Sequence, residues 1–216
     1  DADRQRGIEK LVSLKSPDLI LLDDAFQHRK VRPTRSILLT ACDELYTEES
    51  YLPAGNLRDH RSQALRADLI VVTKCPAEMP EGKKEQIRKR LNPGPGQELA
   101  FSSLCYGEPR GADGHGFPFE ILLKQAVTLV TGIARPEPLL AYLKDRGVRF
   151  EHLAFRDHHD FSEKELKLLQ QRMPILTTEK DAVRLEGKLA DFWVLPVRHC
   201  FAPGEEAVIK QLLGEL

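Results

Sequence analysis

Runs of consecutive apolar residues alternate along the chain with stretches in which apolar positions recur at helical spacing. Continuous apolar runs are typical of strands buried in a parallel sheet, and we expect strands at 19–22, 36–40, 68–73, 99–106, 126–131, 175–177 and 192–197. The helical spacing and the capping residues predict helices at 5–15, 83–91, 136–146, 162–172 and 205–213. This alternation of strands and helices predicts an α/β fold with helices flanking parallel sheets.

Two segments near the middle of the chain interrupt this alternation of strands and helices. Residues 92–96 read Asn-Pro-Gly-Pro-Gly, which cannot continue a helix. Residues 107–118 are rich in glycine, and we interpret them as a flexible connection. The predicted organisation is therefore a first domain at 1–97, a hinge at 98–118 and a smaller α/β domain at 119–216.

Composition narrows the possible functions. The 216 residues are 41% hydrophobic and 30% charged with a net charge of −1, which argues against nucleic acid as a partner. No apolar run approaches the roughly 18 residues needed to span a bilayer. The cysteines form no C-x-x-C pair, so they predict neither a zinc site nor a redox motif; free thiols fit a reducing cytoplasm.

The first candidate for chemistry is the acidic pair Asp23-Asp24, which closes the predicted strand at 19–22. Ligands of parallel α/β sheets lie beyond the carboxyl ends of strands, where a carboxylate can hold Mg²⁺ directly or through water. Gln27 and His28 follow and can donate hydrogen bonds to phosphate oxygens. The alternative is that the acidic pair caps a turn.

Two more segments carry candidate residues. Arg58 ends a loop shaped by proline and glycine and could bind a phosphate in a bidentate manner; alternatively it pairs with Asp59 on the surface. His158, flanked by carboxylates in Asp-His-His-Asp, could relay a proton, bind a metal or merely pack before the next helix. Thr178 with Asp181 could touch a substrate or cap a helix.

Four segments together resemble one enzyme family, tetraacyldisaccharide 4'-kinase, in the right order and over most of the chain. The segments are Leu-Leu-Asp-Asp-Ala-Phe-Gln-His-Arg (21–29), Leu-Pro-Ala-Gly-Asn-Leu-Arg (52–58), Asp-His-His-Asp-Phe-Ser (157–162) and Thr-Glu-Lys-Asp-Ala (178–182). The resemblance implies a P-loop-type kinase domain, of which 1–97 is the C-terminal portion, joined by a hinge to a small α/β domain. Ala25 departs mildly from the family, which usually has glycine there.

The resemblance also implies roles for individual residues. Asp23 and Asp24 would be the Mg²⁺-associated pair, and Asp24 would also be catalytic together with Arg58. His158 would partner a catalytic aspartate. The residues that line the phosphate-transfer site would include Gln27, His28 and Arg4.

The implied activity is transfer of the ATP γ-phosphoryl group to the 4'-hydroxyl of an acylated glucosamine disaccharide 1-phosphate, the precursor of lipid A. ATP and Mg²⁺ are the implied cofactors. The implied location is the cytoplasmic face of the bacterial inner membrane, with peripheral contact to its surface and no protein partner.

The sequence contains no G-x-x-x-x-G-K-[ST] phosphate loop. In the family this loop, a membrane-associating helix and the base aspartate precede the point where this chain begins, so we interpret the chain as N-terminally truncated and expect it to be inactive alone. Two alternatives remain open at this stage: a nucleotide-dependent regulatory switch ATPase, and a non-catalytic α/β binding module.

Overall fold

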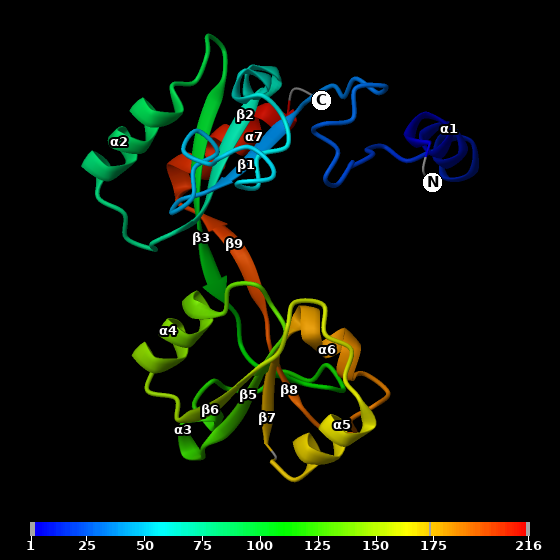
Figure 1. The fold of residues 1–216 in the computed structure, drawn as a ribbon, viewed down its shortest axis with the longest axis vertical. Coiled ribbons are helices and arrows are strands. Elements are labelled where there is room, and N and C mark those ends of the chain that lie inside the picture. Colours follow the sequence, from blue (N-terminus) through cyan, green and yellow to red (C-terminus); the bar gives the residue numbers. More distant parts are fainter. Residues whose placement is uncertain (1–2, 173, 215–216) are drawn as a thin grey trace. The chain divides into compact units, whose positions relative to one another are not determined.

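The computed structural model describes residues 3–172 and 174–214, which fold into two compact units. The first unit comprises Asp1–Leu104 and His199–Leu216, and the second comprises Cys105–Arg198. Each unit has its own sheet and helices (Figure 1). The mixed α/β class with parallel sheets and flanking helices confirms the predicted fold class.

The sheet of the first unit has the strand order β1-β2-β3-β9, and β1, β2 and β3 run parallel. Its strands are β1 (Ile37–Ala41), β2 (Leu69–Cys75), β3 (Glu98–Tyr106) and β9 (Val197–Phe201). The helices of this unit are α1 (Arg4–Lys15), the 3-10 helix η1 (Arg61–Arg66), α2 (Glu81–Leu91) and α7 (Pro203–Gly214).

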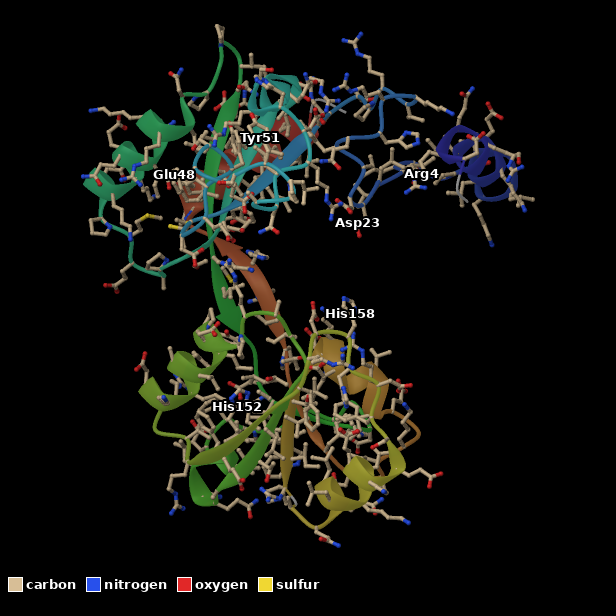
Figure 2. The ribbon with its side chains drawn as sticks, viewed as in Figure 1. Arg4, Asp23, Glu48, Tyr51, His152 and His158 are labelled. Carbon is tan, nitrogen blue, oxygen red and sulfur yellow. The ribbon has the colours of Figure 1, made fainter. Side chains whose placement is uncertain are left out.

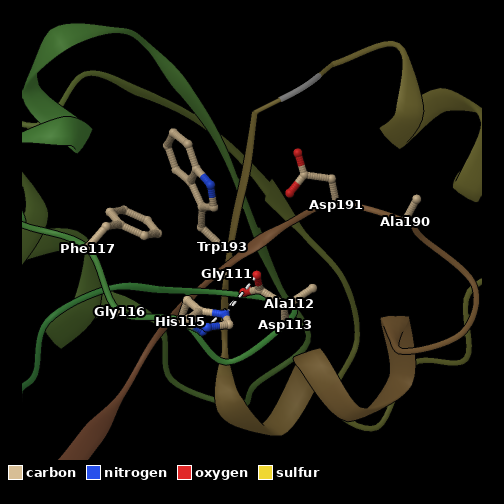
Figure 3. Close-up of a pocket in the computed structure, with 9 residues that line it drawn as sticks. All are labelled: Gly111, Ala112, Asp113, His115, Gly116, Phe117, Ala190, Asp191 and Trp193. Atoms are coloured by element: carbon tan, nitrogen blue, oxygen red, sulfur yellow. Dashed lines mark hydrogen bonds and ion pairs between the residues drawn. The ribbon is translucent and has the colours of Figure 1, made fainter.

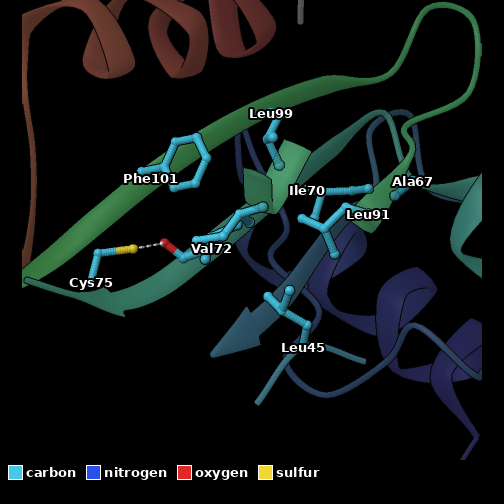
Figure 4. Close-up of a cluster of buried hydrophobic side chains, with 9 residues drawn as sticks. Leu45, Ala67, Ile70, Val72, Cys75, Leu91, Leu99 and Phe101 are labelled. Atoms are coloured by element: carbon cyan, nitrogen blue, oxygen red, sulfur yellow. Dashed lines mark hydrogen bonds between the residues drawn. The ribbon is translucent and has the colours of Figure 1, made fainter. Parts of the chain in front are cut away.

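The side chains of β2 point alternately to the two faces of this sheet, and each face packs against a helix. Successive side chains of a strand point to opposite faces. Ile70 and Val72 pack in one cluster with residues of α2 (Figure 4), whereas Leu69 and Val71 pack with Leu212 of α7. Full burial of such a side chain stabilises the fold by roughly 1.5–3 kcal/mol, so these two clusters hold the helices on the sheet.

The sheet of the second unit has the order β4-β8-β7-β5-β6, in which only β4 runs antiparallel to its neighbour. Its strands are β4 (Arg110–Gly111), β5 (Val127–Thr131), β6 (Phe150–Ala154), β7 (Ile175–Thr178) and β8 (Trp193–Leu195). Its helices are α3 (Ile121–Lys124), α4 (Glu137–Asp145), α5 (Glu163–Gln170) and α6 (Glu179–Leu185).

The side chains of β5 also alternate between the two faces of the second sheet, and helices pack against both faces. Leu129 of β5 packs in a cluster with Leu143 of α4, and the next residue, Val130, packs on the other face with Leu169 of α5 and Leu185 of α6. The second unit therefore has a core of its own.

The predicted strand at 19–22 is wrong, because this segment has no regular secondary structure in the chain. Leu19, Leu21 and Leu22 are 54%, 83% and 36% exposed. A strand of a parallel sheet needs neighbours that pair its backbone and bury both of its faces. No strand of the described ranges 3–172 and 174–214 pairs with this segment. The apolar run alone therefore does not make a strand.

The middle and end of the chain also differ from the sequence interpretation. Residues 107–118 form an ordered turn rather than a flexible connection: Gly111 N–H donates to His115 O, and Phe117 N–H donates to Pro109 O, both at 2.9 Å. β4, inside this segment, pairs with β8. The segment His199–Leu216 groups with the first unit, whereas the sequence placed it in the second domain.

The cysteines are not all free, which corrects the expectation from their spacing. Cys105 and Cys200 are disulfide-bonded, whereas Cys42 and Cys75 are free thiols. Spacing in sequence does not reveal which thiols approach one another in a fold, and so the prediction failed. Burial raises the pKa of the Cys75 thiol to about 12, which keeps it protonated and unreactive.

Among the helices of the described residues, none is both long and apolar enough to cross a bilayer.

Candidate active site

The acidic pair lies in a solvent-exposed turn rather than at a strand end. Asp23 (Figure 2) and Asp24 are both exposed, and Asp24 has a left-handed backbone with φ of +48°. Aspartate tolerates this conformation better than most residues. Both carboxylates are therefore accessible to a ligand.

The residues after the acidic pair anchor this turn to the first unit. Phe26 packs against the cluster that surrounds Ile70. Arg66 donates from Nη2 to Phe26 O at 2.8 Å, and its guanidinium lies 4.6 Å from the Phe26 ring centroid. The acidic pair thus lies close in sequence to Phe26, whose side chain packs against the core of the first unit.

The two phosphate-binding candidates in this turn differ in burial. Gln27 is exposed, whereas His28 is half-buried and its backbone N–H donates to Ala25 O at 2.8 Å. The Nδ1 atom of His28 is buried and has no hydrogen-bond partner. Buried polar atoms are nearly always paired in proteins, so Nδ1 is a candidate contact for a ligand.

The loop that carries Arg58 is closed by its own backbone. Leu52 N–H donates to Leu57 O at 3.0 Å, and Leu57 N–H donates to Ser50 O at 3.1 Å. A Cβ at Gly55 would lie 2.4 Å from Ser50 O, so this turn requires glycine. Arg58 therefore follows a tight loop that its own backbone hydrogen bonds hold closed.

An ion pair joins this loop to the turn of the acidic pair. Arg29 Nη2 donates to Asp59 Oδ2 at 3.2 Å. The backbone hydrogen bond from His60, followed by the bond from Arg29, lowers the pKa of the Asp59 carboxyl. The structure therefore brings together two motifs that lie about 30 residues apart in sequence.

Asp59 pairs with Arg29 and not with Arg58, which the sequence had left open. Arg58 is exposed and has no ion-pair partner within residues 3–172 and 174–214. Its guanidinium is therefore available to an anionic ligand at this edge of the first unit.

Arg4 lies on a helix that buries none of its residues. It begins α1, whose N-cap Asp3 accepts hydrogen bonds from the backbone N–H groups of Gln5 and Arg6. The role of Arg4 in the phosphate-transfer site therefore stays a prediction.

His158 belongs to the second unit and follows β6. Its side chain is 72% exposed and its backbone is left-handed, with φ of +60°. Asp157 Oδ1 accepts the His158 backbone N–H at 3.0 Å and the Lys180 ammonium at 2.7 Å. The hydrogen bond from Lys180 is the main cause of a lowered pKa for Asp157. His158 thus lies on an ordered loop that its neighbours hold in place.

The neighbouring His159 has a structural role. Its side chain is only 17% exposed, and Nε2 lies 3.1 Å from Glu165 Oε1. Its ring stacks on Phe155, with 4.8 Å between centroids.

Sequence reasoning missed Arg184, which contacts His158. Arg184 Nη2 lies 3.0 Å from His158 Nδ1, and Arg184 Nη1 donates to Asp181 Oδ1 at 2.8 Å. The signal was present in the sequence, since Asp181 and Arg184 are three residues apart on a helix and share a face. The sequence suggested that Asp181 touches a substrate or caps a helix, but not that it anchors an arginine.

A pocket of about 370 Å³ lies elsewhere in the second unit (Figure 3). It is lined by Gly111, Ala112, Asp113, His115, Gly116, Phe117, Ala190, Asp191 and Trp193. Trp193 starts β8, whereas His158 and Asp181 follow the carboxyl ends of the parallel strands β6 and β7. The pocket is therefore separate from the candidate residues.

The acidic pair fits Mg²⁺ in the type of its ligands. The described part of the chain contains no group of three or more His, Cys, Asp or Glu side chains that could enclose a metal. Mg²⁺ is commonly held by one or two carboxylates together with substrate phosphates and water, not by a complete protein cage. Two exposed carboxylates next to phosphate-binding candidates match this arrangement.

Known proteins resemble the chain over its whole length. The profile of the tetraacyldisaccharide-1-P 4'-kinase family matches residues 1–216. The tetraacyldisaccharide 4'-kinase of Flavobacterium johnsoniae is 42% identical over 208 residues, covering 93% of this chain and 60% of the relative. That of Bacteroides thetaiotaomicron is 40% identical over 205 residues, covering 86% of this chain and 54% of the relative.

A solved structure is similar as well. The "apo" form of LpxK from Aquifex aeolicus in complex with ATP matches with a TM-score of 0.72 and 26% identity. The match covers 99% of this chain and 62% of the Aquifex chain. The chain thus spans between about half and two thirds of the length of the relatives named here.

Proposed function

The chain belongs to the tetraacyldisaccharide-1-P 4'-kinase family, and on this premise we propose that it forms part of an enzyme that phosphorylates the 4'-hydroxyl of an acylated disaccharide with ATP. The observation that carries the proposal is the link between the two loops. The Arg29–Asp59 ion pair holds the Asp23-Asp24 turn beside the loop of the unpaired Arg58. Oxygen ligands for a cation next to a free guanidinium suit a polyphosphate.

Asp23 and Asp24 would hold Mg²⁺. When bound, the ion would neutralise negative charge on the phosphates. Gln27 would donate from its exposed amide to a phosphate oxygen. His28 would contribute its unpartnered Nδ1 as a donor in the tautomer that protonates this nitrogen.

The reaction is an in-line phosphoryl transfer. The 4'-hydroxyl oxygen forms a bond to the γ-phosphorus while the bond from that phosphorus to the β–γ bridging oxygen breaks, and ADP leaves with the electron pair. The hydroxyl proton passes to a carboxylate base, which His158 would hold by a hydrogen bond. Arg58 would offset the charge that builds up on the transferring phosphoryl group.

The substrate would be an acylated glucosamine disaccharide 1-phosphate, a precursor of lipid A. Acyl chains partition into a bilayer by about 0.8 kcal/mol for each buried methylene, so the enzyme would meet this substrate at a membrane surface. Because ATP is the donor, we place the reaction on the cytoplasmic face of the bacterial inner membrane.

A chimera tests the role of the acidic pair. The aligned part of the Flavobacterium johnsoniae kinase is replaced by this chain, and phosphorylation of the lipid disaccharide is followed with labelled ATP. We expect Asp23→Asn to lower kcat by about 100-fold or more without changing the circular dichroism spectrum. Asp18→Asn, which changes another exposed aspartate nearby, should stay within about twofold of the parent. Equal activity of both variants would show that the acidic pair only caps the turn and does not act in the reaction.

A further inference from the structure

A fully buried carboxylate lies beside the loop of His158. Asp181, on α6, has an exposed fraction of 0%. Gly132 N–H and Thr178 Oγ1 donate to Asp181 Oδ2, each at 2.9 Å, and Arg184 Nη1 donates to Asp181 Oδ1 at 2.8 Å. Both carboxylate oxygens therefore accept hydrogen bonds, as a buried charge requires.

The backbone fixes the position of this carboxylate. A Cβ on Gly132 would lie 3.0 Å from Asp181 Oδ1 and 3.1 Å from Arg156 O, so a side chain at this position would force its neighbours to shift. The Thr178 side chain accepts the Asp181 backbone N–H at 3.2 Å and thereby caps α6. Asp181 thus offers Arg184 a rigid anchor.

Arg184 connects this anchor to the imidazole. The Nη1 atom donates to Asp181, and Nη2 lies 3.0 Å from His158 Nδ1. A guanidinium has only donors and stays charged at all relevant pH values. Nδ1 must therefore accept, which leaves the ring proton of a neutral His158 on Nε2.

The Nε2 side of the ring has no hydrogen bond within the part of the chain that the structure describes. The nearest carboxylate oxygen, Asp157 Oδ2, lies 3.8 Å from Nε2, beyond hydrogen-bond distance. Asp157 Oδ1 already accepts from Lys180 and from the His158 backbone. Since the ring is 72% exposed, its Nε2–H is available to another group.

We propose that Asp181 and Arg184 are positioning residues that hold His158 as the Nε2-protonated tautomer, so that it acts as a hydrogen-bond donor. In the kinase reaction, a role that rests on the proposed function, this N–H orients the carboxylate base and favours its ionised form. The proton of the 4'-hydroxyl then goes to that carboxylate and not to the imidazole.

The tautomer can be measured directly on the 216-residue chain. Two-bond ¹H–¹⁵N correlation spectra of histidine-labelled protein distinguish the two ring nitrogens, and His158→Gln identifies the signals of His158. We expect the wild-type ring to carry its proton on Nε2. A ring protonated mainly on Nδ1 would overturn the proposal, and the tautomer itself is read from the wild-type chain.

Variants then test the cause. Arg184→Met should convert His158 to a mixture of tautomers. Arg184→Lys should restore the Nε2–H tautomer only in part, because one ammonium cannot replace the fork that reaches both partners. Lys188→Met is the matched control: it removes a cation paired with Asp160, in the same loop, at 2.6 Å and should leave the tautomer unchanged. An unchanged tautomer in folded Arg184→Met protein would contradict the assignment.

The catalytic consequence is measured in the chimera. Arg184→Met should lower kcat by about 10–100-fold with little change in KM, because positioning of the base matters in the transition state. An unchanged kcat would contradict the positioning role. If the parent chimera makes no phosphorylated product, the proposed function fails, whereas the spectroscopic result still decides the tautomer.

Discussion

At the scale of single residues, the two arginines of the joined loops have different surroundings. Arg29 is 61% exposed and pairs with Asp59, and exposed ion pairs of this kind stabilise a fold by about 0–1 kcal/mol. Arg58 has no such partner among the residues that the structure describes. We therefore attribute a ligand-binding role to Arg58 and a loop-joining role to Arg29.

Substitution of the two arginines should separate these roles. We expect Arg58→Met in the chimera to lower kcat by about 10²–10³-fold, since it removes a donor to the transferring phosphoryl group. Its Tm should not change, because no ion pair is lost. Arg29→Met serves as the comparison and should have the smaller effect on kcat. A larger loss of activity in Arg29→Met would reverse the assignment.

Gly132 is the residue whose substitution tests the buried carboxylate most simply. An added methyl group would crowd Asp181 and the carbonyl of Arg156. We expect Gly132→Ala to destabilise the chain by about 1–3 kcal/mol in urea unfolding. Gly82→Ala, on a helix where an added Cβ meets nothing within 4 Å, should be neutral or slightly stabilising. Equal stability of the two variants would show that the Asp181 site is not tightly packed.

At the scale of elements, α5 begins with a complete capping box. Ser162 N–H donates to Glu165 Oε2 at 2.8 Å, the Ser162 hydroxyl donates to the same oxygen at 2.7 Å, and Glu165 N–H donates back to the hydroxyl. The bonds from Ser162, followed by that from His159, lower the pKa of Glu165 to about 2. The capping residues of the sequence had predicted a helix that begins at this position, over 162–172.

The capping box should make stability depend on pH in the acid range. The pKa of Glu165 falls from 4.5 in the unfolded chain to about 2 in the folded one. Its contribution is therefore fully present above about pH 4.5 and is lost as the pH falls toward 2. We expect the stability difference between wild type and Glu165→Gln, measured by urea unfolding, to shrink over this interval. A difference that stays constant down to pH 2.5 would contradict the assignment.

Elements with strong local signals were predicted well, and elements that depend on tertiary partners were not. β2 was predicted because its apolar run is also its buried core. Residues 19–22 have an equally apolar run but no pairing strand in the described chain. β6 was missed because its residues are only partly buried at a sheet edge, and the run from Phe150 to Ala154 is interrupted by Glu151 and His152.

At the scale of the whole molecule, each unit has its own hydrophobic core. Leu129 is fully buried in the second unit, beneath α4. We expect Leu129→Ala to destabilise this unit by about 2–5 kcal/mol and to lower amide-exchange protection in residues 105–198 much more than in β2. Leu123→Ala, at a position 41% exposed, should have little effect. An equal loss of protection in β2 would show that the two units unfold together.

The candidate site was predictable in its parts and not in its connections. The motifs located Asp23, Arg58 and His158 because their residue types suit phosphoryl transfer. The sequence did not reveal the Arg29–Asp59 link or the contact from Arg184 to His158, because these join segments 30 and 26 residues apart. Such contacts depend on how loops fold, which local patterns do not encode.

The most direct test of the central claim is identification of the product that the chimera makes from ATP and the acylated disaccharide 1-phosphate. Mass spectrometry with fragmentation locates the added phosphate, and the 216-residue chain alone is assayed in parallel. We predict ATP-dependent phosphate at the 4' position from the chimera, and no product from the chain alone, because its sequence contains no G-K-[ST] phosphate loop. A folded chimera that binds Mg²⁺-ATP but leaves the 4'-hydroxyl unmodified would contradict the account.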